Sequence, residues 1–266
     1  MAIESDVLVI GGGLAGLTAG LASARAGAHT RVISYKQSTL RQATGLIDVL
    51  GYVDGEGPVA DPFAAIPDLP PDHPYRLVGI EDVRAGLALF DEVTDGYAGR
   101  HTDANALVPT HGGTVKPTAR YPASVAAGLA SDDRDALLVG FDAHLDFDAP
   151  RVAAHLRATG VPFDVRGVTV RFPGDLRDDA KITRYARALD RDESVTQDGT
   201  TVGTREALAA TVAPHLDGEK RVGFPAILGD ERPDGVRDAL ANALGVDVFE
   251  VPGGPPSLPG LRLEDQ

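Results

Sequence analysis

The first 26 residues contain an apolar run, a glycine-rich turn and a helix-forming segment, and this order restricts the fold more than any other feature. Val7–Ile10 is a continuous apolar run, which predicts a strand buried on both faces of a parallel sheet. The turn Gly11-Gly-Gly-Leu-Ala-Gly16 has G-x-G-x-x-G spacing, and the helix formers of Leu14–Ala26 follow it, ended by Gly27. A fingerprint in this setting predicts a nucleotide or flavin site, and a turn that serves packing alone is the less favoured alternative.

Each glycine of the turn has a mechanical role. Gly11 permits the sharp change of direction, Gly13 lets the backbone approach a phosphate, and Gly16 lets helix and strand pack closely. The helix N-terminus adds free N–H donors and a positive dipole end. We therefore expect a cofactor site made of six consecutive residues: Gly11, Gly12, Gly13, Leu14, Ala15 and Gly16.

The end of the second predicted strand bears on which cofactor is bound. Residues 29–34 read as this strand, and in many dinucleotide-binding folds an acidic residue near its end holds the adenosine ribose. Residues 34–38 contain no carboxylate. The missing carboxylate counts against NAD as the cofactor and favours a mononucleotide. A cofactor whose adenosine is held by other groups is the alternative that remains.

The charge balance excludes several partners. The chain of 266 residues carries 39 acidic and 25 basic residues, a net charge of −14, and no cysteine. An acidic, lysine-poor surface stays hydrated in high salt, so we interpret the chain as a halophilic cytoplasmic protein; an ordinary acidic protein is the alternative. Nucleic acid and anionic lipid are disfavoured as partners. Cysteine-based zinc or iron–sulfur sites are excluded, the histidines show no metal spacing, and no leader or membrane span is expected.

The rest of the chain predicts a second α/β domain. Residues 52–75 are rich in proline, glycine and aspartate, which is typical of an exit from one domain into another. Beyond them the patterns predict helices over 78–93, 150–160, 179–189, 206–216 and 233–244, and strands over 136–141, 164–172 and 247–251. They also predict a loop or hairpin over 108–118 and a strand with its turn over 221–229. The second βαβ pattern, over 136–172, lacks a glycine fingerprint, so we interpret it as scaffold. After Pro252 we expect a helix start with almost no helix following.

Several segments together resemble one family. They occur in the correct order over nearly the whole chain: Gly11–Gly16, Gln37-Ser38, Gly45-Leu-Ile-Asp48, His73-Pro-Tyr75, Pro109-Thr110, Gly113-Thr-Val-Lys-Pro-Thr118, Phe224-Pro-Ala-Ile-Leu-Gly229, Glu250-Val-Pro252 and Pro255-Pro-Ser-Leu-Pro-Gly-Leu-Arg-Leu263. The chain resembles the B subunit of anaerobic glycerol-3-phosphate dehydrogenase, within the fumarate-reductase-like flavoproteins.

The resemblance implies a function and partners. It implies an FMN flavoprotein that oxidises sn-glycerol 3-phosphate to dihydroxyacetone phosphate and passes electrons toward quinone. It also implies an FAD-containing A subunit and a membrane-bound iron–sulfur C subunit, which would place this cytoplasmic chain at the membrane through a partner. One alternative is a flavin protein that only relays electrons or serves assembly. Another is a stand-alone FAD- or NAD-linked oxidoreductase of a different substrate, against which the missing acidic residue after Ser34 argues.

The resemblance also implies a domain organisation. We expect a Rossmann-like FAD/NAD(P)-binding α/β fold with an inserted α/β (α+β) domain: residues 1–51 form the flavin-binding segment, 52–250 the inserted domain, and 251–266 the start of the return. Because members of the family continue well beyond this point, we expect an incomplete flavin domain with uncovered apolar surface and weak flavin retention.

Catalytic residues are not assigned by the resemblance. A phosphate-bearing substrate needs cationic or N–H-rich contacts. Four basic residues are candidates for this contact: Lys116, Arg120, Arg41 and Arg76. Either His111 or His73 is a candidate base for the substrate hydroxyl.

Overall fold

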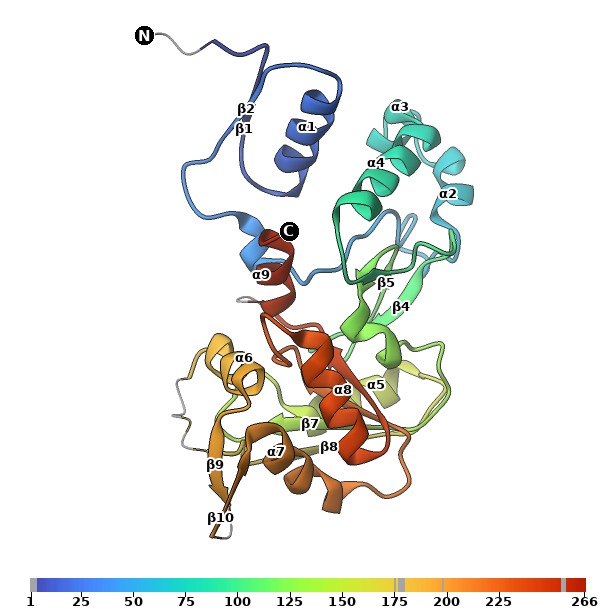
Figure 1. The fold of residues 1–266 in the computed structure, drawn as a ribbon. Coiled ribbons are helices and arrows are strands. Elements are labelled where there is room, and N and C mark those ends of the chain that lie inside the picture. The colour runs from blue at the N-terminus through green and yellow to red at the C-terminus, as the bar shows by residue number, and fades with distance from the viewer. Residues whose placement is uncertain (1–3, 175, 177–179, 198, 255–256) are drawn as a thin grey trace.

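The computed structural model describes residues 4–174, 176, 180–197, 199–254 and 257–266. Figure 1 shows an N-terminal unit at the top, a helical and hairpin region beside and below it, and an α/β sheet with its helices at the bottom. The predicted helix start at position 179 and the predicted turn residues 255 and 256 lie outside the described residues.

The N-terminal unit is a single βαβ arrangement. Strands β1 (Val7–Ile10) and β2 (Thr30–Ile33) pair in parallel, and helix α1 (Leu14–Arg25) connects them. The predicted elements are present, but the prediction that the first strand is buried on both faces is wrong. Leu8 is 53% exposed and Ile10 is 80% exposed, because α1 covers one face and no third described strand joins the pair.

A helical and hairpin region connects this unit to the large sheet. Helix α4 buries Leu87 and Phe90 as its periodicity predicts, but it begins two residues later than expected, because Gly79 at φ +92° ends the preceding helix. Of the two alternatives left open for residues 108–118, a loop or a hairpin, the structure has the hairpin, as two antiparallel strands. The elements are η1 (Thr39–Gln42), α2 (Pro62–Ala65), η2 (Ile66–Asp68), α3 (Pro74–Val78), α4 (Ile80–Val93), β3 (Tyr97–Ala98), β4 (Ala106–Pro109), β5 (Val115–Thr118), β6 (Tyr121–Pro122) and η3 (Ala123–Gly128).

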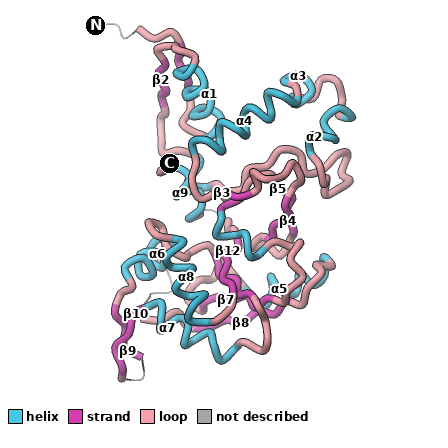
Figure 2. Tube along the Cα trace, turned by 45° about the vertical axis from the view of Figure 1, so that its right-hand side comes forward, coloured by secondary structure: helices cyan, strands magenta, loops and turns pink. Residues whose placement is uncertain are grey.

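Helix α4 also lies beside the N-terminal unit. Figure 2 shows α1 and α4 close to one another at the top of the molecule. Arg25 at the end of α1 forms an ion pair with Glu92 of α4, with 2.6 Å between Nη1 and Oε2. Both side chains are largely exposed, so this pair contributes little to stability.

The largest layer is a four-stranded parallel sheet in the order β12-β11-β7-β8. All four strands lie where the sequence predicts them, with bounds Ala136–Phe141 (β7), Val165–Val170 (β8), Arg221–Pro225 (β11) and Asp247–Val251 (β12). The connecting elements are α5 (Ala149–Thr159), α6 (Ile182–Arg191), β9 (Ser194–Gln197), β10 (Thr200–Gly203), α7 (Thr204–Val212), η4 (Ala213–His215) and α8 (Pro233–Leu244). The antiparallel hairpin β9–β10 was not predicted.

Helices cover both faces of this sheet. Leu137, Val139 and Phe141 pack with α6, α7 and α8, whereas Ala136 and Leu138 face α5. Alternate residues of one strand thus enter two different cores, which explains why β7 is buried at every position.

The last helix, near the C-terminal end of the described chain, packs on η1. Helix α9 (Leu258–Glu264) has seven residues, so the expectation of almost no helix after Pro252 is wrong. The Gly260 backbone packs so tightly on η1 that a Cβ there would lie 2.1 Å from the Leu40 carbonyl oxygen. The Ser257 N–H donates to the Arg41 carbonyl at 3.3 Å, and α9 therefore ties η1 to the large sheet (Figure 1).

Candidate functional site

The glycine turn between β1 and α1 has a backbone geometry that larger residues would disturb. Gly11 has φ +118°, a conformation that L side chains rarely adopt. A Cβ on Gly16 would lie 2.1 Å from the Gly11 carbonyl oxygen, and a Cβ on Gly13 would lie 2.9 Å from Thr39 Oγ1. The positive φ of Gly11 and the tight packing of Gly16 on the Gly11 carbonyl match the turn and packing roles expected of these two glycines, and Gly13 lies against Thr39. Their role in cofactor binding stays a prediction.

The first turn of α1 presents unpaired N–H groups. Gly13 is the N-cap residue and has no side chain to satisfy them, and the first turn carries no acidic residue. Among the residues that the structure describes, no acceptor pairs with the amides of Leu14, Ala15 and Gly16. A helix N-terminus in this state fits an anionic group such as a phosphate.

The segment η1 is hydrogen-bonded to this turn. Ser38 Oγ donates to the Gly12 carbonyl at 2.6 Å and accepts from the Leu40 N–H at 3.1 Å. The end of β2 beside it offers no carboxylate: Ser34 Oγ donates to the Lys36 carbonyl, and Tyr35 is 94% exposed. The site therefore combines unpaired helix N-terminal amides with the absence of a carboxylate at the end of β2.

Each basic side chain that the sequence suggested for a phosphate contact has a partner within the protein. Lys116 Nζ lies 2.6 Å from Asp48 Oδ2, and Arg120 makes a forked contact with Asp91, with 2.8 Å for both Nε–Oδ1 and Nη2–Oδ2. The other two are bound as well, Arg41 by Glu264 and Arg76 by the Pro67 carbonyl. Because Arg120 is buried and also donates to the Gly99 and Ala119 carbonyls, its role is structural.

The two histidines suggested as bases differ in their surroundings. His73 is the N-cap of α3, where its Nδ1 accepts from the Tyr75 N–H at 3.1 Å, so this ring is engaged in capping. His111 lies in the β4–β5 turn and its ring lines a cavity at the carboxyl ends of the large sheet. His144 lines the same cavity but was not selected from the sequence; its place just after a buried parallel strand was the available signal.

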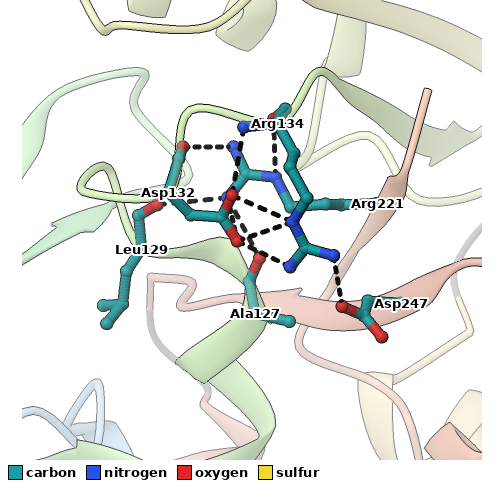
Figure 3. Close-up of polar contacts among 6 residues, drawn as sticks. All are labelled: Ala127, Leu129, Asp132, Arg134, Arg221 and Asp247. Carbon is teal, nitrogen blue, oxygen red and sulfur yellow. Dashed lines mark hydrogen bonds and ion pairs between the residues drawn. The ribbon is translucent and has the colours of Figure 1, made fainter.

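A second charged cluster, at the amino end of the large sheet, is structural. Figure 3 shows the fully buried Arg221 donating to four carbonyls, those of Ala127, Leu129, Asp132 and Arg134, at 2.8–3.1 Å. Its guanidinium is thus satisfied by backbone oxygens of the segment that precedes β7. Arg134 bridges Asp132 and Asp247, and its hydrogen bonds lower the pKa of Asp132 to about 2.

The described part of the chain contains neither a membrane-crossing helix nor a metal cluster. None of its helices has both the length and the apolar character that crossing a bilayer requires. The same residues contain no group of three or more histidine, aspartate or glutamate side chains placed to hold a metal ion.

A βαβ unit with a glycine turn and unpaired amides is the arrangement with which α/β proteins bind nucleotides and flavins. Comparison with known families agrees: the profile described as FAD binding domain matches residues 6–266, and the chain belongs to this family. The predicted fold class is thereby confirmed. No solved structure matches the chain.

The relatives carry the name that the resemblance suggested. The chain is 68% identical over 266 residues to a protein of Halobacterium salinarum named as the probable B subunit of anaerobic glycerol-3-phosphate dehydrogenase, covering 100% of this chain and 62% of that relative. Proteins named as the B subunit of the same dehydrogenase from Pectobacterium atrosepticum and Vibrio cholerae are 33% and 29% identical, over 97% and 98% of this chain. They are covered to 62% and 61%, so the chain spans about three fifths of their length.

Proposed function

We propose that the chain binds a flavin phosphate at the turn formed by Gly11, Gly12, Gly13, Leu14, Ala15 and Gly16. The unpaired amides of the first turn of α1 support this, because they fit an anion and have no acceptor among the described residues. The proposed flavin is FMN in preference to FAD, since the end of β2 lacks the carboxylate that would hold an adenosine ribose. Ser38, which is bonded to this turn, would fix η1 beside the flavin.

The proposed reaction is oxidation of sn-glycerol 3-phosphate to dihydroxyacetone phosphate, with electrons passed toward quinone. When bound, the flavin supplies the acceptor for a hydride from the substrate carbon. The similarity of the whole chain to proteins named as the B subunit of this dehydrogenase is the observation that carries the proposal. The proposed assembly contains an FAD-bearing A subunit and a membrane-bound iron–sulfur C subunit, which would hold this chain at the cytoplasmic face of the membrane.

One observation favours the alternative, a flavin protein that relays electrons from a catalytic partner. The four basic residues suggested for a phosphate contact are all engaged by carboxylates or carbonyls of the chain itself: Lys116, Arg120, Arg41 and Arg76. A phosphate site built from them would require these partners to be displaced.

Anaerobic flavin reduction in the reconstituted complex separates the two proposals. Flavin identity is first established by extraction and mass analysis, with FMN expected. The flavin absorbance of this chain is then followed after addition of glycerol 3-phosphate, with and without the FAD-bearing partner. Bleaching without that partner supports the dehydrogenase, and bleaching only with it supports the relay. No flavin in the complex, or a flavin that glycerol 3-phosphate never bleaches, contradicts both.

A further inference from the structure

The large parallel sheet contains a point where its connections change sides. From β7 the chain crosses through α5 on one face to reach β8, and from β11 it crosses through α8 on the other face to reach β12. The two helices therefore diverge from the carboxyl ends of the adjacent strands β7 and β11. In open parallel sheets, ligands bind in the crevice that such a divergence leaves.

A cavity of about 270 Å³ lies at this position. It is lined by the loop after β7, by Pro225 and Ala226 at the end of β11, and by the segment after β12. Its volume falls just below the roughly 300–1,000 Å³ of pockets that hold drug-sized ligands. The occupant that fits is therefore smaller than a nucleotide or a flavin.

Two further polar side chains line the cavity, those of Ser257 and His111. Ser257 is only 2% exposed, and its Oγ has no hydrogen-bond partner among the described residues. A buried hydroxyl without a partner is costly, so a ligand or water that bonds to it is favoured. The His111 ring lies against Gly254, where a Cβ would be 3.1 Å from Nε2, so the absence of a side chain at Gly254 admits this ring.

His144 adds a third polar group, and its ring is fixed by packing against Tyr185. Its ring packs edge-on against Tyr185, with 5.7 Å between centroids, and its backbone N–H donates to the Phe141 carbonyl at 3.0 Å. Burial lowers the pKa of His144, and the opposing effect of Asp146 is smaller. The imidazole is therefore neutral near pH 7 and offers one donor and one acceptor.

The charge of the lining selects against an anion. The described residues around the cavity include the carboxylate of Asp146 but no lysine or arginine, while Phe147, Ile182 and Val251 supply apolar surface. The neutral imidazole of His144 and a serine hydroxyl match ligand hydroxyl groups, each of which both donates and accepts. Apolar walls match a short carbon skeleton.

We propose that this cavity at the carboxyl ends of β7 and β11 is a binding site for a small uncharged polyol, held by Ser257, His144 and His111. The site is separate from the glycine turn, and binding there requires no flavin. Through Ser257, whose N–H donates to the Arg41 carbonyl, the cavity adjoins η1, and η1 contacts the glycine turn through Ser38.

The test is a titration of the full chain with glycerol, followed by the imidazole resonances of isotope-labelled histidine. We expect saturable shifts at His144 and His111 and none at the exposed His29 and His101. Ser257→Ala should raise the dissociation constant for glycerol about 2- to 12-fold, the range for loss of one hydrogen bond. The matched control is Ser131→Ala, an exposed serine at the other end of the sheet, which should leave the constant unchanged.

Several outcomes would overturn the proposal. Equal shifts at all histidines would indicate a solvent effect, and identical constants for Ser257→Ala and the unaltered chain would show that only water uses this hydroxyl. Saturable binding of inorganic phosphate at His144 would show an anion site instead. His111→Gln provides a second variant, expected to weaken glycerol binding with a fold unchanged in the amide spectrum. Because no flavin is involved, failure here leaves the flavin-reduction experiment unaffected.

Discussion

Two of the parallel βαβ units, β1-α1-β2 and β7-α5-β8, are of similar size, and only the first strand of the second unit is buried at every position. In the N-terminal unit, β1 has exposed side chains at Leu8 and Ile10, and β2 exposes Val32 and Ile33. In the second unit, β7 is buried at all six positions. The helices α1 and α5 have 12 and 11 residues, so helix length does not explain the difference.

The elements that surround each unit explain this difference in burial. One helix covers one face of a two-stranded sheet, and the other face requires a second layer. The second unit has that layer in α6, α7 and α8, and two further strands protect one edge. The first unit has neither among the described residues, which leaves Leu8 and Ile10 exposed.

Core truncation gives the largest expected effect and the sharpest contrast. Leu137→Ala in β7 should lower the free energy of unfolding by about 2–5 kcal/mol, because its side chain is fully buried between strand and helices. Leu8→Ala in β1 should cost far less, because half of this side chain is exposed. Urea unfolding of both variants measures the difference. Equal losses would show that the face of β1 is covered in solution.

Gly16→Ala tests the turn of the N-terminal unit. Its Cβ would meet the Gly11 carbonyl oxygen at 2.1 Å, so we expect a loss of about 1–3 kcal/mol that is confined to this unit. Hydrogen exchange should show faster exchange in α1 and unchanged protection in β7. The control is Gly86→Ala in α4, where nothing lies within 4 Å of the new Cβ and stability should rise by about 0.5–1 kcal/mol. Slower exchange in α1 of Gly16→Ala would contradict the packing geometry.

The amino end of the large sheet provides a pH-dependent effect. The pKa of Asp132 is about 2 because of its hydrogen bonds with Arg134, compared with a usual value of 3.8. The folded chain thus favours the ionised carboxylate, and this stabilisation is complete above pH 4 and is lost as the pH falls through 2.

Asp132→Asn should therefore lower the free energy of unfolding at pH 7 by about 1–2 kcal/mol. This range already includes a reduction for solvent screening, because the ion pair is partly exposed. The loss of stability should become smaller as the pH falls toward 2. The matched control is Asp133→Asn, at the exposed neighbouring residue, which should change the free energy of unfolding by less than about 0.5 kcal/mol. Stability curves against pH check both variants. A loss that is independent of pH would contradict the assignment of this effect to the carboxylate.

The smallest expected effect concerns the exposed face of β1. Ile10→Lys should change the free energy of unfolding by less than about 0.5 kcal/mol, because Ile10 is 80% exposed. The same change should reduce self-association at high protein concentration, since exposed apolar strands promote it. Light scattering over a concentration series measures this. A large destabilisation would show instead that a part of the protein covers Ile10.

Local patterns predicted most of the elements correctly. The apolar runs of β7 and β12 have the bounds expected from sequence, and α8 begins at Pro233 and ends at Leu244 as its proline and following glycine indicate. The hairpin β9–β10 was missed because its strands are short and polar, with no apolar alternation to reveal them. The burial of β1 was overestimated because an apolar run indicates what a strand can bury and carries no information about whether a second layer is present.

The sequence alone determined the elements, the glycine turn and the family, because each depends on neighbouring residues or on order along the chain. Only the tertiary structure decided that Lys116 pairs with Asp48, that Arg120 is bound by Asp91, and that His111, His144 and Ser257 share one cavity. Along the chain, His144 lies 33 positions after His111, and Ser257 lies 113 positions after His144. They meet because the strand order changes direction between β7 and β11. Side-chain partners that distant in sequence are selected by packing, which no local pattern encodes.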